Sequence, residues 1–173
     1  MPSPSSINVG FVGLSTTGWA TVIEPALQSL GDTYRIVAVS TTNETSAQAS
    51  AQRLSEQTSY PVKAYHGDTT QIANDPDVDF VIVAVKAPQH KDVLLPVIQA
   101  KKPFFVEWPA GRNVQETREL ADAARQNGVR SIVGLQGRQS PVLNKVGSSH
   151  QAWTFWLAKG NACRLRNSSR LER

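Results

Sequence analysis

The chain has 173 residues, of which 40% are hydrophobic and 18% are charged, and its formal net charge is +4. This length suits one compact domain and excludes two full-sized ones. The low charged fraction excludes a disordered chain, and the lack of an apolar run of about 18 residues excludes a membrane-spanning one.

The cysteine content and the first residues indicate the compartment. Cys163 is the single cysteine, so no internal disulfide can form, and no Cys/His cluster has the spacing of a metal site. Residues 1–6 lack the basic and apolar regions of a secretory signal, and we expect them to be disordered. We therefore expect a soluble protein of the cytoplasm or the nucleus, without membrane contact.

The positive charge lies at the end of the chain. Of the 18 basic and 14 acidic residues, five basic and one acidic fall within 147–173, which leaves 13 of each within 1–146. Because the neutral part of the chain offers no basic surface for tracking phosphates, we expect no direct contact with nucleic acid.

Short β-rich apolar runs alternate with longer amphipathic stretches, which is typical of a parallel sheet joined by helices. The predicted strands span 7–12, 34–39, 62–65, 80–85, 103–106 and 130–134. The predicted helices span 17–30, 44–57, 89–100 and 114–126. The run 80–85 is apolar on both faces, as a central strand must be. The fold class is therefore a doubly wound α/β domain whose binding crevice lies at the carboxyl ends of the strands.

Several residues predict where the helices begin, bend or end. Gly31 and Gly128 are placed to end two helices in a left-handed conformation. Pro25 is expected to bend or shorten the first helix. Asn113 and Glu116 have the spacing of a capping box at the start of the last predicted helix.

The sequence changes character after residue 146. Three aromatic residues, Trp153, Phe155 and Trp156, lie close together, and an Arg-rich stretch without clear periodicity follows. We expect 7–146 to form the domain and 147–173 to be an atypical basic tail outside the fold, such as a read-through or misassembled terminus.

A glycine-rich turn follows the first predicted strand. Gly13, Ser15 and Gly18 have the spacing of G-x-G-x-x-G, with serine in the second position. Glycine permits a tight turn, and the amino terminus of the following helix attracts a pyrophosphate. We expect Gly13, Ser15, Thr17, Gly18 and Trp19 near the pyrophosphate of a dinucleotide; the alternative is a glycine-rich turn without a ligand.

The end of the second predicted strand carries hydroxyl groups instead of an acid. A carboxylate at this point usually binds the adenosine ribose of NAD, whereas the sequence here is Ser-Thr-Thr-Asn. We expect Thr41 and Thr42 near the ribose and a slight preference for NADP over NAD, because neutral hydroxyls do not repel a 2′-phosphate. The alternative is a polar turn that caps a helix.

Two further loops are candidates for the nicotinamide half of the site. Lys86, Pro88 and His90 follow the central strand, and Glu107 and Trp108 follow the fifth. We expect all five along the nicotinamide. For His90 the sequence favours a structural role over that of an acid or base, and for Trp108 stacking on the nicotinamide and packing in the core remain equal alternatives.

Four motifs together resemble the Gfo/Idh/MocA oxidoreductases over residues 7–146. They are the Gly13–Gly18 turn, Ala87-Pro88 with His90, Glu107-Trp108-Pro109, and Gly134-Leu-Gln-Gly-Arg-Gln-Ser-Pro141. Within this group the chain is most similar to the branch that contains the fungal galactose-pathway transcription regulators. The resemblance implies a Rossmann domain that binds NAD or NADP, followed by a domain that holds a sugar-like substrate and drives oligomerisation.

The sequence departs from this family in two ways. Working enzymes have Glu-Lys-Pro after the fifth strand, and here Trp108 takes the place of the lysine, so we expect catalysis by the usual scheme to be impaired. The substrate domain does not fit into 27 residues, so we expect no stable family-type oligomer.

Three functions remain open on the sequence alone. The first is an NAD(P)-binding domain of dehydrogenase descent. The second is a non-catalytic regulator of sugar metabolism that senses a dinucleotide and acts through a protein partner. The third is a remnant that self-associates through the face left bare by the missing domain.

Overall fold

The computed structural model describes residues 6–14 and 18–148. It forms two compact units, Met1–Gly134 and Leu135–Arg173, so the structural division falls twelve residues before the expected start of the tail. The described part of the second unit holds a short 3-10 helix η3 (Gln136–Gln139) and the helix α6 (Pro141–Ser148). Most of the residues expected to form a disordered amino terminus and a basic tail lie outside the described ranges.

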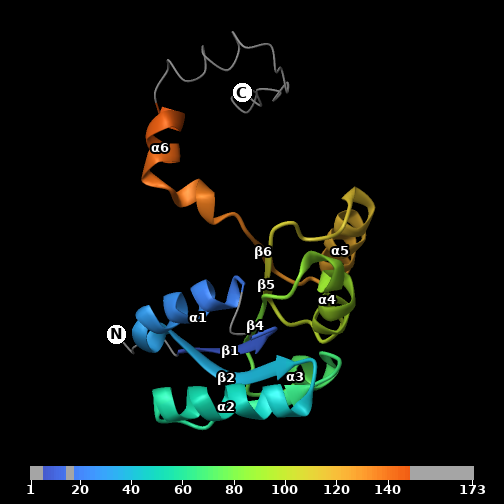
Figure 1. The fold of residues 1–173 in the computed structure, drawn as a ribbon. Helices are drawn as coiled ribbons and strands as arrows, with labels where there is room; N and C mark the ends of the chain where they lie inside the picture. Colours follow the sequence, from blue (N-terminus) through green and yellow to red (C-terminus); the bar gives the residue numbers. More distant parts are fainter. Residues whose placement is uncertain (1–5, 15–17, 149–173) are drawn as a thin grey trace, which may run out of the picture. The chain divides into compact units, whose positions relative to one another are not determined.

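The first unit is built on a six-stranded sheet whose pairs are all parallel. The order is β3-β2-β1-β4-β5-β6, so the direction of winding reverses between β1 and β4 (Figure 1). This topology confirms the predicted doubly wound fold. The strands are β1 (Ile7–Val12), β2 (Tyr34–Thr41), β3 (Lys63–His66), β4 (Phe80–Val83), β5 (Phe104–Glu107) and β6 (Ser131–Gly134).

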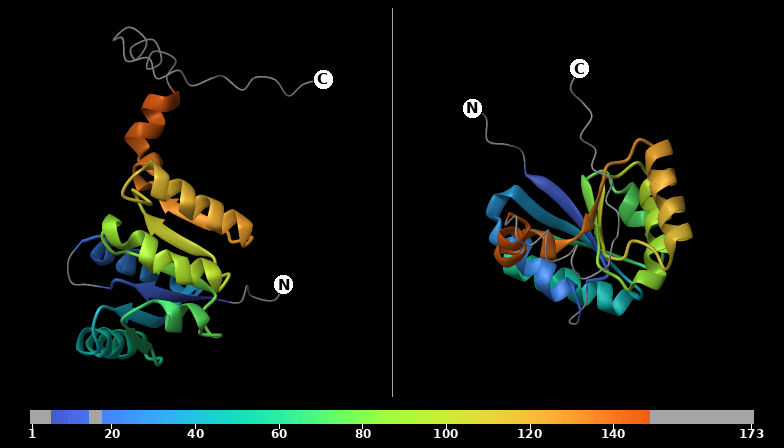
Figure 2. Two further views of the ribbon diagram at one scale, coloured as in Figure 1. Left: turned by 90° about the vertical axis from the view of Figure 1, so that its right-hand side faces the viewer. Right: turned by 90° about the horizontal axis from the view of Figure 1, so that it is seen from above.

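Helices cover both faces of this sheet (Figure 2). They are α1 (Ala20–Ser29), α2 (Glu44–Thr58), α3 (Thr70–Asn74), α4 (His90–Gln99) and α5 (Val114–Gln126), with short 3-10 helices η1 (Gly31–Thr33) and η2 (Ala87–Gln89). Side chains of α1 and α2 join one buried cluster, and those of α3, α4 and α5 join the other. The connections are thus divided between the two faces, as right-handed crossovers require.

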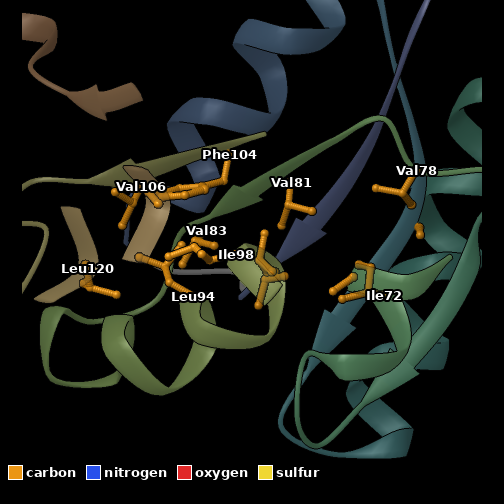
Figure 3. Close-up of a cluster of buried hydrophobic side chains, with 14 residues drawn as sticks. Ile72, Val78, Val81, Val83, Leu94, Ile98, Phe104, Val106 and Leu120 are labelled. Carbon is orange, nitrogen blue, oxygen red and sulfur yellow. The ribbon is translucent and has the colours of Figure 1, made fainter. Parts of the chain in front are cut away.

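Strand β4, in the middle of the sheet, supplies side chains to the buried clusters on both faces. Val81 and Val83 lie in the cluster with α3, α4 and α5, which Figure 3 shows, while Ile82 lies in the cluster with α1 and α2. All three are buried. The alternation explains why the run that contains β4 carries no polar residue on either face.

The boundaries differ from the predicted ones where short-range signals are weak. Helix α1 begins at Ala20 instead of Thr17, which lies outside the described residues, and it contains Pro25. Strand β4 ends at Val83, two residues early, because the chain turns there toward η2. Helix α3 was not predicted, since five residues are too few to display a helical period.

The start of α5 shows half of the predicted capping box. The Asn113 side chain accepts a hydrogen bond from the Glu116 amide at 2.9 Å. The Glu116 carboxylate, however, accepts from the amide of Arg112 at 2.8 Å instead of from that of Asn113. Gly31 and Gly128 have φ angles of +59° and +67° at the ends of α1 and α5, as expected.

Residues 6–14 and 18–148 contain neither a membrane-spanning helix nor a metal-binding cluster. Among these residues no helix is long and apolar enough to cross a membrane. Within the same ranges no group of three or more His, Cys, Asp or Glu side chains is arranged to hold a metal ion.

Candidate functional site

The candidate site residues follow β1, β2, β4 and β5 at the edge where these parallel strands end. Because β1 and β4 are neighbours in the sheet, the loops that follow them lie side by side. Their connecting helices leave on opposite faces, which opens a crevice between the loops. This is the edge at which doubly wound domains bind their ligands.

Gly13 is closely enclosed in the turn after β1. Its φ is +84°, and its amide donates to the Ser40 carbonyl at 2.9 Å. A Cβ at this position would lie 2.5 Å from the Val85 Cγ1 and 3.0 Å from the Ala84 carbonyl oxygen. The positive φ agrees with the tight turn expected of Gly13, and its close contacts with Val85 and Ala84 leave room only for glycine.

Gly18 and Trp19 lead into α1. Gly18 has a φ of +75°, and an added Cβ would meet nothing within 4 Å, so glycine is favoured there by the backbone conformation and not by a close contact. Trp19 occupies the cap position and its side chain is 52% exposed. Ser15 and Thr17, also expected at the pyrophosphate, lie outside the described residues.

The polar segment after β2 caps α2. The Asn43 side chain accepts from the Ser46 amide at 2.9 Å, and the Thr41 hydroxyl donates to the Asn43 carbonyl at 3.0 Å. The Thr41 hydroxyl also lies 2.6 Å from that of Ser46. Thr42 is exposed beside them. The helix-capping alternative is thus correct for Asn43, while Thr42 has the accessibility that a ribose contact needs.

Lys86 and Pro88 lie on the exposed turn that follows β4. The Lys86 carbonyl accepts from the Gln89 amide at 2.9 Å, which closes the 3-10 helix η2, and both side chains are exposed. The ammonium group of Lys86 is therefore accessible to a ligand from the crevice edge.

His90 begins α4 and is only 1% exposed. Its Nε2 lies 2.9 Å from the Val85 carbonyl oxygen and its Nδ1 lies 3.0 Å from the Pro109 carbonyl oxygen. Both ring nitrogens therefore have backbone partners. This geometry agrees with a structural role and leaves neither nitrogen available for the ligand contact that was also expected of His90.

Glu107 and Trp108 lie at the end of β5. Glu107 is buried, whereas the Trp108 side chain is 65% exposed, and the bond between Trp108 and Pro109 is cis. A tryptophan with this exposure is not packed in the core. Of the two alternatives for Trp108, packing in the core and stacking on the nicotinamide, the exposure permits only the second.

The loop that follows Trp108 is fixed by residues that sequence analysis did not assign to it. Arg112 donates from Nε to the Glu116 carboxylate at 2.7 Å and from its amide at 2.8 Å. The hydrogen bond from the Arg112 side chain lowers the pKa of Glu116. A Cβ at Gly111 would lie 2.9 Å from the Thr117 amide nitrogen, so the loop packs against the first turn of α5. The spacing of Asn113 and Glu116 predicts a helix cap but not the contact between Glu116 and Arg112.

A hollow of about 930 Å³ lies away from this edge, and its lining residues come mainly from α1 and the first halves of the strands. Phe80 and Phe105 line it, and both pack against the cluster beneath α1 and α2. Ile132 on β6 also lines it and is 57% exposed. This hollow is apolar and carries none of the candidate site residues, so we do not place the dinucleotide there.

A doubly wound parallel sheet whose first strand ends in a close-packed glycine turn and a helix defines a Rossmann-type nucleotide-binding domain. The model of the GFO_IDH_MocA oxidoreductase family, described as having an NAD-binding Rossmann fold, matches residues 7–135. The chain belongs to this family, as its sequence motifs indicated.

The relatives include both dehydrogenases and regulators. Dehydrogenase aclE of Aspergillus oryzae is 35% identical over 81% of this chain and 38% of its own length. The galactose/lactose metabolism regulatory protein GAL80 of Saccharomyces cerevisiae is 29% identical over 83% of this chain and 34% of its own. The crystal structure of the transcriptional regulator Gal80p from Kluyveromyces lactis has a TM-score of 0.70 and 30% identity, over 84% of this chain and 38% of that one. The chain therefore spans less than two-fifths of each of these relatives.

Proposed function

We propose that this chain binds NAD or NADP in the crevice where β1 and β4 end. The observation that carries the proposal is the turn at Gly13, where positive φ and the contact with Val85 leave no room for a side chain. Such a turn brings the backbone and the amino terminus of α1 close to a pyrophosphate. Ser15, Thr17, Gly18 and Trp19 complete this part of the site.

The nicotinamide half of the dinucleotide lies along the loops after β4 and β5. Lys86 and Pro88 are exposed on the first loop, and Trp108 is exposed on the second, next to the buried Glu107. The indole of Trp108 offers a flat apolar surface for the nicotinamide ring. It has no group that can polarise a carbonyl or transfer a proton, so hydride transfer by the family scheme is impaired.

The adenosine end favours NADP slightly. Thr41 and Thr42 lie at the end of β2, and the segment between β2 and α2 carries no acid to repel a 2′-phosphate. A carboxylate there would instead bind the free 2′-hydroxyl of NAD. The polarity at Thr42 thus determines the choice between the two cofactors.

Replacing Thr42 by aspartate is expected to reverse this preference. The new carboxylate repels the 2′-phosphate and accepts a hydrogen bond from the ribose of NAD, so the Kd for NADP should rise about tenfold, or ~1.4 kcal/mol, while that for NAD falls. Ala49→Asp is the matched control, because it adds the same charge on the exposed side of α2 farther from β2. Equal changes in both Kd values would place the ribose elsewhere.

A second candidate function is a regulator that senses the dinucleotide and acts through a protein partner in the cytoplasm or nucleus, without contacting nucleic acid itself. The exposed Trp108 at the lysine position favours this candidate over a dehydrogenase. A steady-state assay with NAD, NADP and a panel of sugars separates the two. Sustained turnover would exclude the regulator, whereas binding without turnover would support it.

A further inference from the structure

The buried His90 side chain connects two loops at the crevice edge, and a third loop packs against one of them. The turn at Gly13 packs against Val85, as the 2.5 Å separation between a would-be Cβ and the Val85 Cγ1 shows. The Val85 carbonyl faces the Nε2 of His90 at 2.9 Å, and the Nδ1 of His90 faces the Pro109 carbonyl at 3.0 Å. The loops after β1, β4 and β5 are thus joined in sequence by direct contacts.

Both partners of the imidazole ring are carbonyl acceptors, and a neutral ring has one N–H group to donate to them. Val85 lies immediately before Lys86, and Pro109 lies immediately after Trp108. The ring spans the two carbonyl oxygens and donates through whichever nitrogen carries a proton. A hydrocarbon side chain of the same size would fill the space but supply no donor to either carbonyl group.

We propose that His90 is a positioning residue that fixes the Trp108 loop against the Lys86 loop and so sets the geometry of the nicotinamide half. The inference rests on the proposed dinucleotide site. His90 touches no ligand itself, because it is 1% exposed; it acts through the backbone of Val85 and Pro109. Its loss affects recognition of the nicotinamide end and spares the adenine end, which is bound by the loops after β1 and β2.

The test compares the whole dinucleotide with its adenine half. In His90→Phe, titration calorimetry is expected to show binding of NAD and NADP weakened about five- to tenfold, as the loss of a buried hydrogen bond implies. Binding of ADP, which lacks the nicotinamide riboside, should remain unchanged. A general loss of structure would weaken both kinds of ligand equally, and that result would overturn the proposal.

Further variants separate positioning from stability. The side-chain amide nitrogen takes the place of Nδ1 in His90→Asn and of Nε2 in His90→Gln, so the variant that keeps the native donor should recover most of the lost affinity. Leu94→Ala removes a buried apolar side chain one turn later in α4 and leaves the His90 hydrogen bonds to both carbonyls in place, so it should leave the ratio of NADP to ADP affinity unchanged. Asparagine and glutamine variants that both bind as weakly as the phenylalanine variant would contradict a positioning role for the His90 hydrogen bonds.

A measurement without ligand keeps the two proposals distinguishable. Hydrogen exchange of the free protein should become about five- to tenfold faster at the amides of Trp108, Ala110 and Gly111 in His90→Phe. The reason is that the loop after β5 is no longer connected through His90 to the loop after β4. If the wild-type chain binds no dinucleotide, the proposed function fails and the exchange rates alone decide the positioning role. Unchanged exchange in the loop would overturn it.

Discussion

Replacing Gly13 by alanine is expected to abolish measurable dinucleotide binding and to lower the free energy of unfolding by about 2–4 kcal/mol. Two effects add. Alanine at a φ of +84° is strained, and its methyl group would lie 2.5 Å from the Val85 Cγ1 and 3.0 Å from the Ala84 backbone. The turn must move away from β4 to accept it, and a shift of this kind displaces the surface that receives the pyrophosphate.

Gly67→Ala is the matched control for this substitution. Gly67 has nearly the same φ, +82°, but an added Cβ would meet nothing within 4 Å. It should therefore show only the strain, about 1–2 kcal/mol, and retain dinucleotide binding. Denaturant unfolding and calorimetry on both variants separate backbone strain from steric overlap. A Gly13→Ala variant that is no less stable than Gly67→Ala would refute the close packing described for the turn.

Replacing Asp75 by asparagine is expected to destabilise the domain by about 1–3 kcal/mol at neutral pH. The Asp75 side chain is fully buried and accepts from the Lys63 ammonium at 2.8 and 3.0 Å, from the Tyr65 hydroxyl at 3.0 Å and from the Asp77 amide at 3.0 Å. Asparagine keeps the shape but replaces a charged acceptor by a neutral amide. The hydrogen bonds that join Lys63 and Tyr65 of β3 to the segment before β4 are weakened as a result.

The same substitution predicts a specific pH dependence. Burial raises the pKa of Asp75, but the hydrogen bonds from Lys63, the Asp77 amide and Tyr65 together hold it below its ordinary value. Since the folded-state pKa lies below the unfolded one, the carboxylate stabilises the fold above about pH 4 and loses this effect as the pH falls further. The stability difference between wild type and Asp75→Asn should therefore shrink below about pH 4.

Asp77→Asn provides the comparison for this pH series. Asp77 binds the same ammonium at 2.7 Å, but its side chain is 64% exposed, so its removal should cost less than about 1 kcal/mol. Denaturant unfolding of the three proteins at several pH values measures both effects. Equal losses of unfolding free energy in the two variants would contradict the account. So would a difference between wild type and Asp75→Asn that persists unchanged into acid. Either result would show that the buried Asp75 carboxylate does not stabilise the fold through its ion pair with Lys63.

The sequence predicted the parts of the fold that depend on local patterns. Helix α5 and strand β1 have the predicted bounds, because a long amphipathic period and an apolar run bounded by turn residues are strong signals. Helix α3 was missed because its five residues show no period. The Glu116 carboxylate binds Arg112 instead of completing the capping box, which depends on the path of the loop and not on residue spacing.

The candidate site was predictable to a similar extent. The tight turn at Gly13 follows from motif spacing, and the structure supplies the contact with Val85 that explains it. The bonds of His90 could not be predicted, since one of its partners, Pro109, lies nineteen residues away on another loop. Local patterns identify residues near the crevice edge. Only packing between segments far apart in the sequence shows which of them are exposed at the crevice and which are buried and hold the loops in place.

Calorimetric titration of the purified chain with NAD and then with NADP tests the central claim most directly. We expect saturable heat with one dinucleotide per chain and somewhat tighter binding of NADP, because the segment after β2 carries no acid. Circular dichroism on the same sample establishes that the chain is folded. No heat with either dinucleotide from a folded chain would contradict the account and leave a Rossmann domain that has lost its ligand.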